Sequence, residues 1–474
     1  MCSKRLSTNL RVKEKKEKVV DFLFHSKLNN QAMISREPSI KVGILDHRRQ
    51  VYGSFDGVFA IDSSRQLQGT FSARCENGLI VLAGNDGNFI ISAKEIHCAN
   101  VAGGVFTLRD VAIGVQFHWE SREEQTFRGN LILVARDDGT LAVINEISLE
   151  EYLASVISSE MSGEAPYEFL KAHAITSRSW LAAMLGREER NVDIDPERSI
   201  RTNDELIRWY DREDHDIYDV CADDHCQRYQ GITKKASDRA AKSVEATRGL
   251  FLVYGEEICD ARFSKACGGL TEEFENTWEE KHLPYLECIP DSSIQHPKIL
   301  NELAAEDWIL SNPDAYCNTT DENVLRQILP ASDQETTNFF RWAVDYERGE
   351  LEEILISKSG IDFGTLLNLV PFQRGPSGRI SRLKIEGSKK TLVVGKELEI
   401  RRWLSKTHLY SSAFVIMTER ENDGTPKHFL LYGAGWGHGV GLCQIGAAVM
   451  ATKKFSAEEI LKHYFHNAQL RKLY

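Results

Sequence analysis

The feature that most constrains the fold is a change of residue pattern at Ser148. From residue 40 to about residue 115, apolar residues alternate with polar ones and glycine-containing turns separate the segments, which is typical of β-strands. Residues 131–136 and 140–145 then flank Asp138-Gly139, a pair suited to tight turns, and predict a β-hairpin. Two segments with helical periodicity follow directly after Ser148. This order of elements predicts an α+β protein.

The remaining pattern predicts the domain organisation. We expect a charged arm over residues 1–30, a β-rich N-terminal region over residues 31–120, and a mixed α+β domain over residues 121–474. A helical insertion is expected within the last domain, at about residues 296–370. Residues 379–385 and 392–400 are predicted as strands, and a capping box at Ser456 and Glu459 predicts the start of the final helix.

Composition excludes some classes of partner. The chain has 474 residues and a net charge of −12, which argues against nucleic acid because a protein that binds the phosphate backbone needs a basic surface. No segment is apolar for long enough to predict a membrane span. The apolar residues 19–24 are interrupted by Asp21, so we expect no signal peptide, and the localisation stays open.

A glutamate occupies an unexpected position in the first helical segment. Ser148 and Glu151 match a capping box, and the helix is predicted to run to about Met161. Glu160 falls in the middle of the apolar face of this helix. The residues that form that face are Leu149, Leu153, Val156 and Ile157. Glu160 is therefore either a member of a buried ion pair or an acid whose pKa is raised by desolvation at the floor of a cleft.

The second helical segment carries an arginine at the edge of its apolar stripe. The helix is predicted to begin at Pro166, a residue suited to the first turn. Its stripe consists of Leu170, Ala174, Leu181 and Leu185. Arg178 is either the structural partner of Glu160 or a residue that binds an acetamido or carboxylate group of a substrate.

Two histidines and two cysteines stand close together in the middle of the chain. His215, Cys221, His225 and Cys226 offer a set of ligands that suits tetrahedral zinc, and four protein ligands imply a structural ion. The alternatives are reduced cysteines beside solvated histidines, or a short-range disulfide. The other eight of the ten cysteines are scattered and do not predict a disulfide framework.

Several stretches, in order along the chain, resemble one family. They are EYLASVISSEMSGEAPYEFLKAHAITSRSWLAA (151–183), FSKACGGLTEEFENTW (263–278), SGRISRLKIEG (377–387), EIRRWLS with SSAF (399–414) and GAGWGHGVGLCQIGA (433–447). Together they resemble the stage II sporulation protein D family (SpoIID/LytB domain) over about residues 127–474. The sequence departs from the family's motifs at His173, Cys267 and Cys443, where the family usually has Gln, a small Ser and Ser.

The resemblance implies that residues 121–474 form a SpoIID/LytB-like catalytic domain of a peptidoglycan lytic transglycosylase. Such an enzyme cleaves the glycan strand between N-acetylmuramic acid and N-acetylglucosamine and leaves a 1,6-anhydro end. The glutamate of the family's Ser-Glu-Met segment, its catalytic acid, corresponds to Glu160. Some members carry zinc at a stretch that resembles residues 215–226. Two alternatives stay open, a non-catalytic glycan-binding protein that enhances a cell-wall amidase, and a zinc-dependent hydrolase.

The glycine-rich stretch completes the set of candidate residues. Six glycines between residues 433 and 446 allow positive φ and a close approach of backbone or ligand. If this loop lines the cleft, Trp436 can stack on a sugar ring, and His438 and Gln444 can hydrogen-bond hydroxyl or acetamido groups. The alternative is a tight structural loop with a core tryptophan and a hydrogen-bonded histidine.

Overall fold

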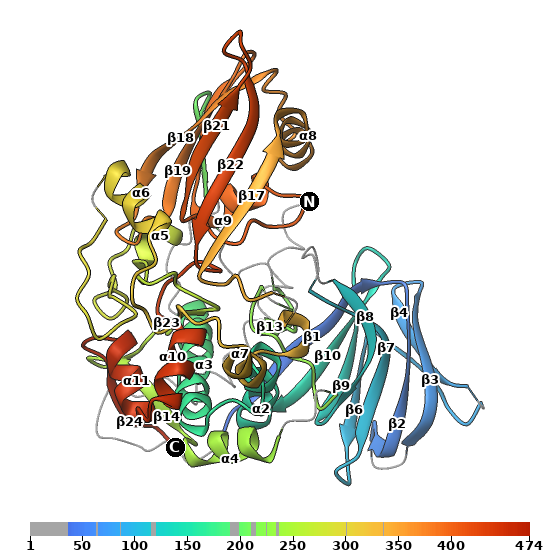
Figure 1. Ribbon diagram of the computed structural model, residues 1–474. Coiled ribbons are helices and arrows are strands. Elements are labelled where there is room, and N and C mark those ends of the chain that lie inside the picture. Colours follow the sequence, from blue (N-terminus) through green and yellow to red (C-terminus); the bar gives the residue numbers. More distant parts are fainter. Residues whose placement is uncertain are drawn as a thin grey trace.

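The computed structural model describes residues 37–62, 65–85, 87–114, 120–189, 199–209, 215–223, 225–233, 237–299, 301–334 and 336–474. The charged arm predicted over residues 1–30 lies outside these residues. The chain is an α+β protein with a β-rich N-terminal region, as the sequence predicts (Figure 1).

An extended sheet forms the N-terminal region. Its strands are β1 (Ser39–Arg48), β2 (Gln50–Ala60), β3 (Gln66–Glu76), β4 (Leu79–Gly84), β5 (Ile90–Ala93), β6 (Glu95–Asn100), β7 (Val105–Ile113), β8 (Ser121–Phe127), β9 (Asn130–Ala135), β10 (Leu141–Ser148) and β13 (Val220–Cys221). The strand order is β13-β1-β10-β9-β6-β2-β3-β4-β5, and β7 joins β2 to β8. The predicted hairpin is confirmed by β9 and β10, where Gly139 adopts φ +81°.

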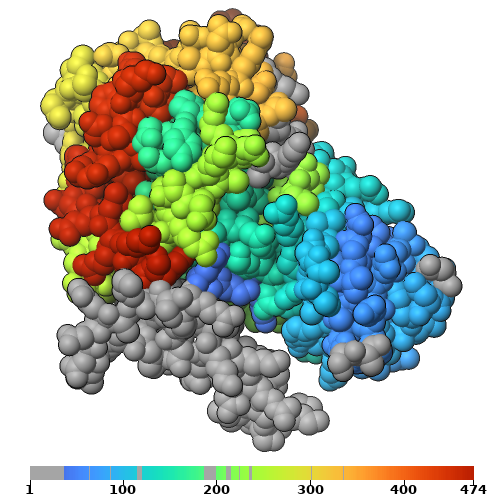
Figure 2. Space-filling model, turned by 90° about the horizontal axis from the view of Figure 1, so that it is seen from below, coloured from blue at the N-terminus to red at the C-terminus, as the bar shows by residue number. Residues whose placement is uncertain are grey.

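A group of helices packs beside this sheet and shares one hydrophobic core with it. They are α2 (Leu149–Glu160), α3 (Tyr167–Glu189), α4 (Asp238–Ala246), α7 (Glu322–Ile328), α10 (Gln444–Thr452) and α11 (Ala457–Tyr464). The Ser148 hydroxyl accepts a hydrogen bond from the Glu151 N–H, which confirms the predicted start of α2. The C-terminal helices, red in Figure 2, lie against the green middle part of the chain.

Short pairings connect this helical layer across the chain. One small sheet has the order β15-β14-β24, and β16 pairs in parallel with β23. Their bounds are β14 (Leu250–Tyr254), β15 (Glu257–Ile258), β16 (Phe263–Ser264), β23 (Leu442–Cys443) and β24 (Gln469–Lys472). The glycine-rich stretch is thereby joined to residues 263–264.

A third part of the molecule has a core of its own, at the top of Figure 1. It contains two sheets, with orders β11-β12-β20-β19-β18 and β17-β22-β21. Its strands are β11 (Ser199–Arg201), β12 (Glu205–Arg208), β17 (Arg341–Glu347), β18 (Leu366–Arg374), β19 (Ile380–Gly387), β20 (Thr391–Gly395), β21 (Phe414–Arg420) and β22 (Pro426–Ala434). The helices nearby are α5 (Phe274–Thr277), α6 (Glu302–Leu310), α8 (Arg348–Ser359) and α9 (Glu397–Trp403). A 3₁₀ turn at Ala331–Asp333 follows α7 in the helical layer.

The structure corrects three predicted boundaries. The division after residue 120 falls between β7 and β8, which are paired, so the N-terminal sheet continues to Ser148. The predicted insertion at 296–370 contains α6, α7 and α8 but also β17, because Arg341–Glu347 pairs with β22. The strand predicted over 392–400 ends at Gly395, where α9 follows with two acidic residues in its first turn. None of the described helices is both long enough and apolar enough to cross a membrane.

Candidate active site

Glu160 is the last residue of α2 and its side chain is buried, with 8% of its surface exposed. Its Oε1 accepts a hydrogen bond from the backbone N–H of Arg228 at 2.9 Å. The carboxyl group is therefore oriented by the segment that follows Cys226. An acid held in this way presents a defined direction to a reacting atom.

A buried ion-pair network adjoins Glu160 on its backbone side. The Lys265 ammonium donates to the Glu160 carbonyl oxygen at 2.9 Å and pairs with the Asp333 carboxylate at 2.7 Å. Asp333 also lies 3.6 Å from the Arg228 guanidinium. Lys265 and Asp333 thus join residues from two distant segments at the end of α2. Sequence reasoning missed both, because their pairing depends on contacts that no local pattern indicates.

Of the two alternatives predicted for Arg178, its position fits the structural one, although its partner is a different glutamate. It is fully buried and forms a two-pronged pair with Glu150, with N–O distances of 3.1 and 2.6 Å. It also donates to the Leu250 carbonyl oxygen at 3.1 Å. The partner is Glu150, at the first turn of α2, and not Glu160, at its last turn. Arg178 therefore fixes α2 against α3 and has no surface to offer a ligand.

The glycine-rich loop wraps around a second buried arginine, Arg379. The Arg379 guanidinium donates to the Gly437 carbonyl oxygen at 3.2 Å and to the Cys267 carbonyl oxygen at 3.0 Å. A Cβ added at Gly439 would lie 2.3 Å from the guanidinium carbon. Gly439, which follows His438, consequently has a packing reason, because it leaves room for Arg379.

Arg379 also reaches a buried carboxyl group. Ser377 Oγ donates to Glu272 at 2.6 Å and lies 3.1 Å from the Arg379 guanidinium. Burial raises the pKa of the Glu272 carboxyl to about 7, although the hydrogen bond from Ser377 acts to lower it. The three stretches that contain Glu272, Arg379 and Gly437 are therefore one interlocked unit.

His438 is partly buried and held on one edge, because its Nδ1 accepts a hydrogen bond from the Val440 N–H at 3.0 Å. Its ring lies 4.9 Å from the Trp278 ring, centre to centre. Burial, together with the guanidinium groups of Arg262, Arg379 and Arg401, keeps the pKa of His438 well below its usual value. The imidazole is thus neutral at physiological pH and can exchange hydrogen bonds without carrying charge.

The other two candidates in the loop are placed differently. Trp436 is partly buried and packs against Tyr410 and Phe339, with ring centres 4.3 and 4.9 Å away. Gln444, the first residue of α10, is 2% exposed and lies 3.3 Å from His173, Nε2 to Nε2. Gln444 therefore contacts His173 and not the surface, which replaces its predicted contact with a sugar.

The four predicted metal ligands converge. His215, Cys221, His225 and Cys226 place their ligand atoms within 4.8 Å of one another. The separations are 3.3 Å from His215 Nε2 to Cys226 Sγ, 3.6 Å from Cys226 Sγ to His225 Nδ1, and 3.9 Å from Cys221 Sγ to His225 Nδ1. In the absence of an ion, the neighbouring Cys226 thiol and burial raise the pKa of Cys221 to about 11. This His-Cys cluster lies two residues before Arg228, whose N–H holds Glu160.

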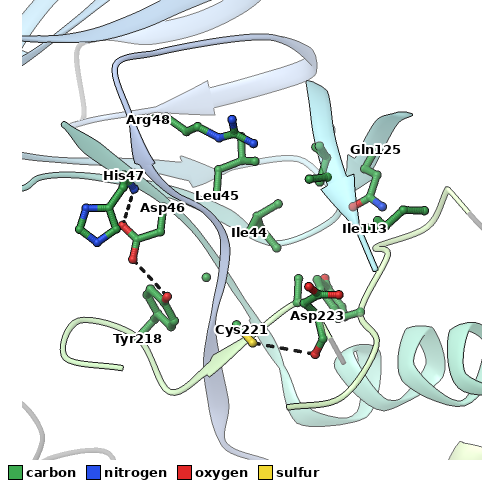
Figure 3. A pocket seen from close by; sticks show the side chains of 15 residues that line it. Ile44, Leu45, Asp46, His47, Arg48, Ile113, Gln125, Tyr218, Cys221 and Asp223 are labelled. Carbon is green, nitrogen blue, oxygen red and sulfur yellow. Dashed lines mark hydrogen bonds between the residues drawn. The ribbon is translucent and has the colours of Figure 1, made fainter. Parts of the chain in front are cut away.

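A cavity of about 240 Å³ adjoins the His-Cys cluster on the side of the N-terminal sheet (Figure 3). Cys221 and Asp223 line it together with residues of β1, and Tyr218 donates to the Asp46 carboxylate at 3.1 Å. Glu160 is not among the lining residues. The cavity therefore belongs to the junction between the sheet and the cluster and not to the candidate acid.

Part of the chain that carries these residues matches a known protein family. Residues 137–254, which include Glu160 and the His-Cys cluster, match the family described as Stage II sporulation protein (SpoIID). Stage II sporulation protein D of Bacillus amyloliquefaciens is 24% identical over 328 residues, which are 69% of this chain and 75% of that protein. The chain contains a SpoIID domain over residues 137–254.

Other comparisons extend the SpoIID match. Stage II sporulation protein D of Bacillus subtilis (strain 168) is 24% identical over 331 residues, 69% of this chain and 75% of that protein. An amidase enhancer of the same organism is 24% identical over 241 residues, 48% of this chain and 32% of that protein. Residues 272–441 match a family described as a domain of unknown function (DUF8618). That second match ends inside the glycine-rich loop, outside the SpoIID match.

Proposed function

We propose that this protein cleaves bacterial peptidoglycan glycan strands as a lytic transglycosylase, with Glu160 as general acid and base. The family and the similarity to an amidase enhancer support the broader statement, a function related to the cell wall. The observation that carries the finer proposal is the position of Glu160. Its carboxyl group is oriented by the Arg228 N–H at the end of α2 and keeps 8% of its surface exposed.

The proposed reaction needs one carboxyl group used twice. Glu160, protonated, donates its proton to the glycosidic oxygen as the bond from that oxygen to C1 of the muramic residue breaks. The 6-hydroxyl of the same residue then attacks C1 and returns its proton to the Glu160 carboxylate. The product is a 1,6-anhydro ring, no water is consumed, and the acid is regenerated. A second carboxylate that activates water is not required, in contrast to an inverting hydrolase.

We further propose that the His-Cys cluster holds one structural zinc ion. A tetrahedral ion with Zn–S of about 2.3 Å and Zn–N of about 2.0 Å separates S and N ligand atoms by about 3.5 Å. The separations of 3.3, 3.6 and 3.9 Å fit that arrangement. His215, Cys221, His225 and Cys226 would bind the ion and fix the segment that leads to Arg228. Four protein ligands leave no position for a reacting water, which disfavours the zinc hydrolase.

A second candidate function is a glycan-binding protein that enhances a cell-wall amidase. The similarity to the amidase enhancer of Bacillus subtilis favours it. The two candidates differ in one measurable property, because an enhancer binds glycan without breaking it.

Mass spectrometry of products distinguishes the candidates. Purified protein is incubated with glycan strands stripped of their stem peptides, and with intact peptidoglycan in parallel. The proposal expects new ends that carry 1,6-anhydromuramic acid, and ends heavier by one water would indicate a hydrolase instead. Uncleaved glycan that still co-sediments with the protein, together with faster turnover by an added amidase, would favour the enhancer.

A further inference from the structure

A second set of metal-ligand side chains lies in the core, away from the His-Cys cluster. Cys267, Asp291, Cys317 and Cys443 place their ligand atoms within 4.8 Å of one another. All four are buried, with exposed fractions of 2%, 0%, 1% and 0%. They come from four separate segments, so the fold alone brings them together. We call this set the core cluster.

The geometry of the core cluster suits a tetrahedral ion. Cys267 Sγ and Cys317 Sγ are 3.7 Å apart. Two thiolates bound to one zinc ion at about 2.3 Å each are separated by about 3.8 Å. A disulfide would require an S–S distance of about 2.0 Å.

The groups around the core cluster donate hydrogen bonds to the ligand atoms. The Cys267 N–H points to Cys443 Sγ at 3.2 Å, and the Gly269 N–H points to Cys267 Sγ at 3.4 Å. Asp291 accepts from the Cys317 N–H at 2.8 Å through Oδ2 and from the Tyr464 hydroxyl through Oδ1. Donors aimed at sulfur and carboxylate oxygen are the second layer that stabilises metal-bound thiolates and orients the carboxylate.

The buried carboxyl group of the core cluster also favours a bound cation. Among the residues that the structure describes, no Lys, Arg or His forms a salt bridge with the buried Asp291 carboxylate. Arg341 lies near the thiols, but its guanidinium donates to the carbonyl oxygens of Gly268 and Trp308. A carboxyl group buried without a basic partner is either held in its neutral form or paired with a bound cation, and a divalent cation would let Asp291 bind as a carboxylate.

We propose that Cys267, Asp291, Cys317 and Cys443 bind one Zn²⁺ as a closed structural site. Three thiolates favour zinc over harder divalent ions, and the fourth ligand completes the tetrahedron without an open position. The ion would join the loop before α10 to three other segments. It would also brace the candidate acid, because Cys267 lies two residues after Lys265, which contacts the Glu160 carbonyl oxygen.

Metal analysis of the full-length chain tests this site independently of any glycan chemistry. The protein is produced with zinc in the medium and purified without chelator, and zinc per chain is measured by mass spectrometry of the elements. A Cys221→Ser/His225→Ala variant, which lacks two ligands of the His-Cys cluster, is expected to retain one zinc per chain. Adding Cys317→Ser should then lower the zinc content at least about tenfold. Cys288→Ser is the matched control, a buried cysteine outside both clusters, and should change nothing.

Two further measurements test the site without the Cys317 variant, which could fail to fold. In the Cys221→Ser/His225→Ala protein, cobalt in place of zinc should give thiolate-to-metal charge-transfer bands together with the visible bands of a tetrahedral ion. Alkylation of the unreduced wild-type chain should find no disulfide between Cys267 and Cys317. A folded Cys221→Ser/His225→Ala protein without metal, or a disulfide between those cysteines, would overturn the proposal.

Discussion

The two ligand clusters have a similar arrangement of ligand atoms but differ in how far apart their residues lie in the sequence. The His-Cys cluster takes its four ligands from residues 215–226, whereas the core cluster takes them from positions as far apart as Cys267 and Cys443. An ion in the first would close a short loop, and an ion in the second would close long ones, whose closure is costlier in chain entropy. Because its residues are close in the sequence, the His-Cys cluster can be predicted from the sequence. The core cluster can be identified only from the folded structure.

The clusters also share a relation to Glu160. Cys226 lies two residues before Arg228, whose N–H holds the Glu160 carboxyl group, and Cys267 lies two residues after Lys265, which holds its carbonyl oxygen. The candidate acid is therefore supported from two sides. If both ions are structural, neither cluster should supply a reacting group, and the predictions below test that division of roles.

The largest effect is expected at the acid itself. Glu160→Gln removes the proton donor and keeps the shape, so glycan cleavage should fall about 10²–10⁴-fold with an unchanged melting temperature. Rates on denuded glycan and thermal melts measure this. Glu164→Gln is the matched control, an exposed glutamate of the same segment, and should keep full activity. A folded Glu160→Gln protein with normal turnover would remove Glu160 from the chemistry.

The core cluster should matter most for stability. Cys317→Ser is expected to destabilise the whole chain by more than about 4 kcal/mol, because metal binding is coupled to folding and the ligands tie four segments together. Denaturant unfolding with tryptophan fluorescence measures the loss, and Cys288→Ser serves as the control. A loss below about 1 kcal/mol would show that no ion stabilises the core.

The His-Cys cluster should act locally. Cys221→Ala is expected to cost about 1–3 kcal/mol and to increase hydrogen exchange within residues 215–233 more than elsewhere. Because that segment carries Arg228, glycan cleavage should fall while Glu160 remains in place. Equal exchange over the whole chain would contradict the local role and make the two clusters alike.

A smaller effect is expected at His438, and it tests whether the glycine-rich loop packs or binds a sugar. If the imidazole only packs, His438→Ala should lower stability by about 1 kcal/mol or more through the lost bond with the Val440 N–H, with normal turnover per folded molecule. If it binds a sugar, turnover or glycan affinity should fall with little change in melting temperature. Melts and cleavage rates measured on the same preparation separate these outcomes.

The smallest effect concerns pH. Burial lowers the pKa of His173 to about 3, from the usual 6.5. The unfolded chain therefore binds a proton at His173 below pH 6.5 that the folded chain refuses until about pH 3, so stability declines as the pH falls through that window. His173→Gln should flatten the decline, whereas the exposed His97→Gln should not. Identical slopes for the wild type and His173→Gln would contradict the assignment.

Local signals in the sequence were sufficient for much of the fold. The turn at Asp138-Gly139, the cap at Ser148 and the capping box at Ser456 depend on neighbouring residues, and the structure contains all three. The end of the N-terminal sheet and the partner of Arg178 depend on distant pairing, as in β7 with β8 and Arg178 with Glu150, and were not predictable.

The same distinction applies to the candidate site. The burial of Glu160 was predictable because the residue falls on an apolar helix face. The sequence shows Cys267 and Cys443 as isolated departures from family motifs, and only the fold brings them into one cluster with Cys317 and Asp291. Lys265 and Asp333 lack any local signal, since each is explained by the other.

The docking of Arg379 into the glycine-rich loop bears on how this molecule can be divided. The match over residues 272–441 suggests a transferable module, and that region does have its own core. Yet Arg379 of that region anchors to the carbonyl oxygen of Cys267, which lies outside it, and the match stops at Gly441, just before β23 pairs with β16. A fragment cut at these limits would leave a buried guanidinium without one of its acceptors. Grafting the region between relatives should therefore succeed only when residues 263–271 and the loop through Gln444 travel with it.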